Sequence, residues 1–140
     1  MKNVLSSKWA INGLAIILSS IILFHVLVLF KVIPYTIVWG GRITSDSQMR
    51  TFELLSLTIN LIMLLVVGIK ARFINIRINK TIIQVACWCM FLLFAINTIG
   101  NLLSNNQLEK IIFTPLTILL AIFSLKLATT RHAEKQVFNE

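Results

Sequence analysis

Four long apolar runs, separated by short polar segments, dominate the pattern of this 140-residue chain. They cover residues 10–30, the stretch between Glu53 and Lys70, residues 82–99, and the stretch between Lys110 and Lys126. At 1.5 Å per residue, a helix of about 20 residues spans the roughly 30 Å hydrocarbon core of a bilayer. The pattern therefore predicts four transmembrane helices, over residues 9–31, 47–70, 81–101 and 107–128.

Capping residues predict where two of these helices begin. Ser45 followed three residues later by Gln48 fits a capping box, so the second helix should start before its apolar run. Asn106 and Glu109 form a similar pair ahead of the fourth run. That run is short for a span, and Pro115 lies in its first third. We expect the fourth helix to start near Asn106 and to be kinked at Pro115.

Two connections have unusual compositions. Residues 31–44 are apolar and aromatic, which is not typical of a solvated loop, so we expect this segment to fold back against the membrane surface with Gly40-Gly41 as its turn. Residues 70–81 alternate isoleucine with asparagine and arginine. A single strand there would have no partner, so the segment should lie on the lipid headgroups or extend a helix.

The composition agrees with a membrane protein of one domain. Hydrophobic residues make up 57% of the chain and charged residues 13%, with a mean hydropathy of +0.88; soluble domains have about 25% charged residues. The net charge of +8 raises nucleic acid as a partner. The basic residues flank apolar runs and form no separate patch, which argues against nucleic acid and for contact with lipid headgroups.

The basic residues also predict the orientation. An even number of spans places both termini and the 70–81 connection on one side. That side holds nine basic residues: Lys2, Lys8, Lys70, Arg72, Arg77, Lys80, Lys126, Arg131 and Lys135. The other side holds four: Lys31, Arg42, Arg50 and Lys110. Because lysine and arginine accumulate on the cytoplasmic side, this distribution predicts cytoplasmic N- and C-termini. The predicted fold class is therefore an all-α membrane bundle of four helices with both termini in the cytoplasm.

Polar residues of all four spans gather at the outer side in this topology. Ionisable residues at membrane depth are costly and are therefore functional candidates. Glu109 and Thr114 begin the fourth span there. The pattern predicts a ligand-binding pocket in the outer leaflet, roofed by residues 35–42 and formed by His25, Trp39, Arg42, Glu53, Asn60, Asn97 and Asn101.

A purely structural interpretation remains open for the same residues. Glu53 could pair with Arg50 or Arg42 at the headgroup level while the asparagines bridge helices. The aromatic side chains Trp9, Tyr35 and Trp39 fit an interfacial belt.

The chain offers few groups for chemistry. His25 and Glu53 could act together as an acid–base pair, although the spacing does not establish contact. Cys87 and Cys89 are two residues apart on one helix, face different directions, and are expected to pack. The spacing of histidine and cysteine predicts no metal site, and no motif indicates a cofactor.

Two stretches carry a resemblance. They are residues 34–42, Pro-Tyr-Thr-Ile-Val-Trp-Gly-Gly-Arg, and residues 97–102, Asn-Thr-Ile-Gly-Asn-Leu, the latter followed by Glu109-Lys110 and by Phe113-Thr114-Pro115-Leu116-Thr117. Together they resemble a group of uncharacterised small four-span bacterial integral membrane proteins. The resemblance implies a bacterial inner-membrane location and carries over no activity and no catalytic residue.

Three functions follow as hypotheses. The first is a non-enzymatic protein that binds a small or lipid-like ligand, or a partner membrane protein, at the outer polar cluster. The second is a membrane-embedded enzyme that acts on a lipophilic substrate with Glu53 and His25. The third is a small transporter, which at four spans would have to form a homo-oligomer.

Residues 131–140 are expected to be a solvated tail.

Overall fold

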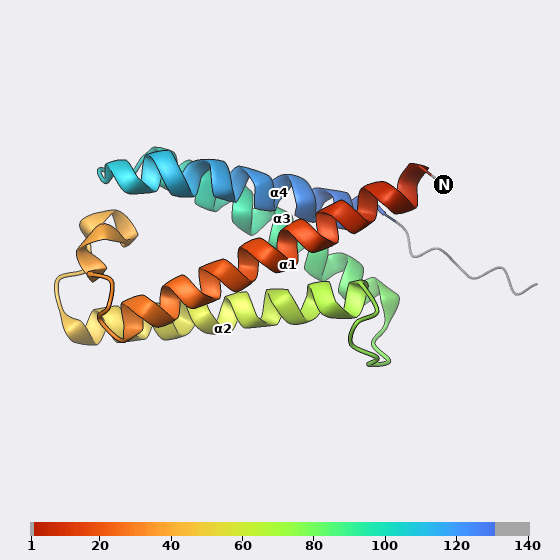
Figure 1. The fold of residues 1–140 in the computed structure, drawn as a ribbon, viewed down its shortest axis with the longest axis horizontal. Helices are drawn as coiled ribbons and strands as arrows, with labels where there is room; N and C mark the ends of the chain where they lie inside the picture. Colours follow the sequence, from red (N-terminus) through yellow and green to blue (C-terminus); the bar gives the residue numbers. More distant parts are fainter. Residues whose placement is uncertain (1, 131–140) are drawn as a thin grey trace, which may run out of the picture.

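Four long helices make up most of the computed structural model, which describes residues 2–130 (Figure 1). They are α1 (Lys2–Leu29), α2 (Asp46–Lys70), α3 (Lys80–Leu102) and α4 (Thr114–Thr129), the last preceded by a π-helical turn, η3 (Glu109–Phe113). Each span, with η3 counted as part of the fourth, is long and apolar enough to cross a membrane. By helix length and hydropathy, the chain is a multi-pass membrane protein.

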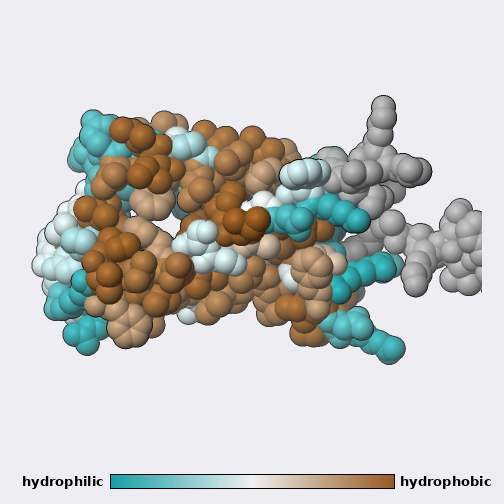
Figure 2. Space-filling model, in the orientation of Figure 1, coloured by the Kyte–Doolittle hydropathy of each residue, from teal (hydrophilic) through white to brown (hydrophobic). Residues whose placement is uncertain are grey.

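Large apolar side chains are exposed on the outside of every helix. Figure 2 shows a hydrophobic surface over the middle of the bundle and hydrophilic residues toward its two ends. A soluble monomer rarely exposes continuous apolar surface on this scale, whereas lipid solvates it without cost. The predicted all-α bundle of apolar spans is confirmed. Exposed examples are Ile16 and Leu23 of α1, Leu54 and Leu61 of α2, Leu92 and Ile96 of α3, and Ile118 and Ile122 of α4.

The helices associate as two pairs. α1 packs along α2 and α3 along α4, while α1 also contacts α4 and α2 touches α3 much less (Figure 1). We call the end at which α1 begins and α4 finishes the terminal end. The main apolar core lies in that half of the bundle and holds the pairs together. It includes Leu14 and Leu18 of α1, Val67 of α2, Cys87 of α3, and Leu120 and Leu127 of α4.

Residues 30–45, the connector, lie at the opposite end, which we call the connector end (Figure 1). The connector contains two short 3₁₀ turns, Tyr35–Ile37 and Trp39–Gly41. Gly40 and Gly41 have φ angles of 66° and 70°, which confirms the glycine turn. A second apolar cluster of Val28, Val38, Ile43 and Met49 packs the connector against α1 and α2.

Hydrogen bonds join the connector to the other helix pair. The Gly40 N–H donates to Glu109 Oε1 at 2.8 Å, and Asn106 Nδ2 donates to the Ile37 carbonyl oxygen at 2.8 Å. The connector therefore lies across the space between the α1–α2 pair and the α3–α4 pair.

The expected caps form, with one change in each pair. Ser45 Oγ accepts from the Gln48 N–H at 3.3 Å, but the Gln48 side chain accepts from Thr44 and not from Ser45. Asn106 Oδ1 accepts from the Leu108 N–H at 2.9 Å, so Asn106 caps the fourth span. Glu109 takes no part in that cap because its carboxylate accepts from Gly40.

The irregularity expected near Pro115 is a π-helical turn, Glu109–Phe113, that ends two residues before the proline. Proline has no N–H, so the regular bonding of an α-helix cannot continue through it. In the widened turn, the Thr114 N–H bonds to the Glu109 carbonyl oxygen. π-Turns of this kind often occur at functional sites, and this one lies where Glu109 turns toward the connector.

One of the two alternatives for residues 70–81 is excluded, and the expectation for the cysteines needs correction. α2 ends at Lys70 and α3 begins at Lys80, and residues 72–79 are exposed and non-helical, so this connection does not extend a helix. Cys87 is buried in the core, whereas Cys89 is exposed, so only Cys87 packs within the bundle. The expected tail at residues 131–140 lies outside the described residues.

The close packing of α1 on α4 leads to a stability prediction. A Cβ atom at Gly13 would overlap the ring of Phe123, whereas one at Gly100 of α3 would meet nothing within 4 Å. We expect Gly13→Leu to lower the unfolding free energy by about 1–3 kcal/mol through overpacking. Gly100→Leu, the matched control, should be neutral or stabilising because glycine is a poor helix former. Thermal unfolding in detergent measures both, and equal effects would contradict the α1–α4 contact.

Candidate functional site

A cavity of about 880 Å³ lies between the two helix pairs in the half of the bundle nearer the connector. All four spans and the connector contribute to its wall. Toward the connector the wall is polar, with His25, Trp39, Arg42, Asn97, Asn101 and Glu109. Toward the main core it is apolar, with Ile21, Ile59, Met63, Leu93, Phe94 and Leu120. This volume is within the range of small-molecule sites, which is about 300–1,000 Å³.

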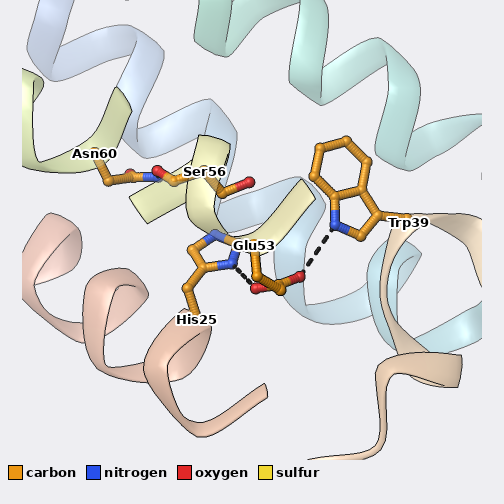
Figure 3. A network of polar contacts seen from close by, with 5 residues as sticks. All are labelled: His25, Trp39, Glu53, Ser56 and Asn60. Atoms are coloured by element: carbon orange, nitrogen blue, oxygen red, sulfur yellow. Dashed lines mark hydrogen bonds and ion pairs between the residues drawn. The ribbon is translucent and has the colours of Figure 1, made fainter. Parts of the chain in front are cut away.

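Glu53 lies at the centre of a buried polar network (Figure 3). Its side chain is 0% exposed. His25 Nδ1 lies 2.6 Å from Glu53 Oε2, and Trp39 Nε1 donates to Glu53 Oε1 at 3.2 Å. Both carboxylate oxygens therefore have an N–H partner, which a buried carboxylate requires. Glu53 is not itself part of the cavity wall; it holds two residues that are.

The helical repeat explains why Glu53 is buried. Residues four, seven and ten positions apart lie near one face of a helix. Met49, Glu53, Met63 and Val67 are the buried residues of α2, and Asn60 lies between them on the same side. Glu53 thus lies on the face of α2 that points into the bundle. The other residues named on that face are apolar, except for Asn60.

Trp39 has a strained backbone. Its φ angle is 57°, in the left-handed region that bulky residues rarely adopt at a cost of roughly 1–2 kcal/mol. Strain of this type persists where other contacts fix the residue, and it is concentrated at functional sites. Here the indole donates to Glu53 and its ring lies 4.9 Å from that of Phe52, centroid to centroid. The network holds Trp39 in the cavity wall.

His25 is fixed through one ring nitrogen, which leaves the other free. Nδ1 contacts Glu53, and within residues 7–130 Nε2 has no hydrogen-bond partner. A neutral ring with its hydrogen on Nδ1 has Nε2 as an acceptor. A histidine oriented by a carboxylate can bind a donor group of a ligand or act as a general base.

The three asparagines of the cavity wall, Asn60, Asn97 and Asn101, retain donors or acceptors without a partner in the described part of the chain. Asn60 Nδ2 donates to the Ser56 carbonyl oxygen at 2.8 Å, and Asn101 Nδ2 donates weakly to Thr117 Oγ1 at 3.4 Å. The Asn97 side chain has no partner among the described residues and is exposed at the cavity wall. Of the three, only Asn101 bridges two helices.

Glu109 is a charged residue of the cavity wall that the sequence did not identify as part of the site. It is 7% exposed, lines the cavity, and accepts from the Gly40 N–H. The sequence indicated only a helix cap or an outer charge. Two features of the sequence could have identified it. Pro115 disturbs the first turns of the fourth span, and the paired glycines Gly40 and Gly41 leave backbone N–H groups accessible to a carboxylate.

The structure brings most of the candidate residues together. His25, Trp39, Arg42, Asn60, Asn97 and Asn101 line one cavity, and Glu53 lies directly behind its wall. That they bind a ligand stays a prediction. The ion pair of Glu53 with Arg50 or Arg42 is wrong, because the carboxylate bonds to His25 and Trp39. The exposed ion pair at this end joins Lys31 to Asp46.

The comparisons with known proteins assign no function to the cavity. Within the described residues, no three histidine, cysteine, aspartate or glutamate side chains gather as a metal site. Comparisons with protein-family models, curated proteins and solved structures find no match to this chain. The resemblance to small bacterial membrane proteins therefore stays an expectation, of which the four spans are the part that the structure supports.

The burial of Glu53 predicts a specific loss of stability. In Glu53→Leu, which is similar in size but has no acceptor, the Trp39 Nε1–H loses its hydrogen-bond partner. Leaving a buried donor unpaired should cost about 1–3 kcal/mol in the free energy of unfolding. Asp46→Asn, a carboxylate in the exposed pair with Lys31, is the control and should cost at most about 1 kcal/mol. Chemical denaturation in detergent compares them; equal losses would contradict the buried network.

Proposed function

We propose that this protein binds a small amphipathic ligand in the cavity between its two helix pairs. The observation that carries the proposal is the composition of the wall: one cavity of about 880 Å³ combines fixed polar groups at the connector end with an apolar wall beside the main core. Ligand sites are commonly apolar with a few precisely held polar groups. The Glu53 network supports the proposal because it fixes His25 and Trp39 before any ligand arrives.

The orientation and location belong to the same proposal. Nine basic residues at the terminal end against four at the connector end support cytoplasmic termini and an outward-facing connector. Of the nine, Arg131 and Lys135 lie outside the described residues. The resemblance to small bacterial membrane proteins supports the bacterial inner membrane. In this setting, the cavity lies in the outer leaflet.

A membrane-embedded enzyme is the second candidate, favoured by one observation. The 2.6 Å contact between His25 and the fully buried Glu53 is the geometry in which a carboxylate orients a general base. The substrate would be lipophilic, and Nε2 of His25 would accept its proton. Glu53 would be a positioning residue, since it does not reach the cavity.

Cysteine labelling tests the orientation. Ser47 and Asn105 are exposed at the connector end, and Asn75 is exposed in the connection between α2 and α3. Single cysteines are placed at these positions in a protein whose Cys87 and Cys89 are replaced by alanine. On intact cells, the cysteines at 47 and 105 should react with an impermeant thiol reagent. The cysteine at 75 should react only after lysis. The opposite pattern would reverse the orientation.

Native mass spectrometry of the purified protein tests ligand binding. We expect the parent protein to carry a bound small molecule after extraction from membranes. Glu53→Gln, His25→Ala and Asn97→Ala should each remain folded and lose most of it, because each change disturbs the polar part of the wall. Asp46→Asn, which lies outside the cavity, should retain it.

Two results would decide against this binding function. A Glu53→Gln protein with its full complement of bound species would show that the network does not support a site. A His25→Ala protein that retains its bound molecule unchanged, where the parent converts that molecule to a product, would favour the enzyme instead.

A further inference from the structure

The fully exposed residues of the cavity wall lie on one side of the bundle. The exposed residues in its wall come from the connector, α2, and α3 with the turn after it: Trp39, Arg42, Gln48, Phe52, Ile96, Asn97, Gly100 and Leu103. The wall residues from α1, α4 and η3 are buried or half-buried. α2 and α3 are also adjacent helices with few contacts. An opening therefore lies between α2 and α3, while a smaller hollow between α1 and the fourth span shares Ile21, Phe24, Phe113 and Leu116 with the cavity wall.

The rim of this opening is suited to lipid. Phe52 on α2 is 39% exposed, and Ile96 on α3 is 67% exposed. Beside them on α2, Leu55 is 52% exposed, which continues the apolar surface outward from the rim. Arg42 and Gln48 make the rim polar near the connector, and Asn97 adds an amide on α3, whereas Phe52 and Ile96 are apolar. This mixed rim suits an amphiphile that enters from the bilayer.

Gly100 keeps the opening free on the α3 side. Helical glycines in membrane proteins usually allow two helices to approach closely. At Gly100 no such approach exists, because an added Cβ would meet nothing within 4 Å. The residue nevertheless lines the cavity. Its missing side chain leaves open space at the entrance and does not serve helix packing.

The polar wall is suited to an uncharged head group. Its inner polar members are amides and hydroxyls: Ser56, Asn60, Asn97, Asn101 and Thr117. An amide offers both a donor and an acceptor, which pairs best with a hydroxyl or another amide. The one basic side chain in the wall besides His25 is the exposed Arg42, and Glu109 adds a carboxylate nearby. A phosphate group needs several cationic partners, which this wall does not provide.

The order of polar and apolar groups along the cavity fixes the direction of the ligand. On α2, Glu53 lies behind the wall, the polar wall residues Ser56 and Asn60 follow it, and the apolar Met63 lies nearest the main core. Asn60 lies about 10 Å beyond Glu53, and Met63 lies about 15 Å beyond it. An amphiphile in the adjoining leaflet has the same order, head at the surface and chain toward the midplane. It can enter sideways without turning over.

We propose that the ligand is a single-chain lipid with an uncharged, hydroxyl- or amide-bearing head, which enters from the bilayer through the opening between α2 and α3 beside Gly100. The head bonds to Asn97, Asn101 and Nε2 of His25, and the chain lies against Met63, Leu93 and Leu120. This inference rests on the proposed ligand-binding function and adds to it the class of ligand and its route.

Quenching of Trp39 fluorescence by brominated lipids tests the class of ligand. Trp9 and Trp88 are exposed and do not line the cavity, so Trp9→Phe with Trp88→Phe leaves Trp39 as the reporter in the wall. The protein is reconstituted in phosphatidylcholine vesicles. A monoacylglycerol and a lysophosphatidylcholine with the same chain, brominated at the end next to the head group and so within reach of Trp39, are added separately. We expect saturable quenching by the monoacylglycerol at a mole fraction at least about tenfold lower than for lysophosphatidylcholine.

A matched pair of variants in this background tests the route. Gly100→Phe fills the open space at the entrance, and Ile99→Phe adds a ring at the neighbouring exposed position, which does not line the cavity. We expect Gly100→Phe to weaken monoacylglycerol binding by at least about tenfold and Ile99→Phe to change it less than about twofold. Asn97→Leu, similar in shape but without the amide, should weaken it as Gly100→Phe does. Thermal unfolding checks that each variant is folded.

The possible outcomes separate the two proposals. Equal or tighter saturable quenching by lysophosphatidylcholine would leave a lipid site but overturn the uncharged head. Unchanged binding in a folded Gly100→Phe protein would overturn the route. Quenching that rises only in proportion to the mole fraction of either lipid would overturn the proposed binding function itself.

Discussion

A buried carboxylate inside a membrane bundle must have hydrogen-bond donors, and this requirement organises the connector end of the protein. Glu53 has no contact with solvent, so both of its oxygens depend on N–H groups from other segments. His25 comes from α1 and Trp39 from the connector, so one side chain of α2 fixes both segments. Glu109, at the start of the fourth span, binds the connector in the same way by accepting a hydrogen bond from the Gly40 N–H. The connector is therefore anchored by two buried carboxylates on opposite sides of the cavity.

The two ends of the bundle differ because their interactions differ. At the terminal end, apolar side chains of all four spans meet and leave little space between the pairs. At the connector end, polar side chains cannot fill that space efficiently, since each needs a partner of defined geometry. The pairs remain separated there, and the connector crosses the gap. The cavity is thus a consequence of replacing apolar packing by a few directed hydrogen bonds.

Much of the architecture could be predicted because it depends on local pattern. The spans follow from the length of their apolar runs, and the caps at Ser45 and Asn106 follow from residues close in sequence. The partner of Glu53 could not be predicted with certainty, because His25 lies 28 residues away and Arg50 is nearer in sequence. Burial decides between them: an inward position on α2 excludes the surface arginines. Glu109 was missed because a π-turn changes which face of the helix a residue occupies, and no periodicity reports it.

The two anchors act on neighbouring residues of the connector. The indole of Trp39 is bound to α2 through Glu53, and the backbone of Gly40 is bound to the fourth span through Glu109. The Trp39 side chain and the Trp39–Gly40 peptide unit therefore connect the two hydrogen bonds and tie the helix pairs together at the roof of the cavity. α2 and α3 have few contacts with each other. We therefore expect motion that widens the cavity to separate α2 from α3 and to leave the roof in place.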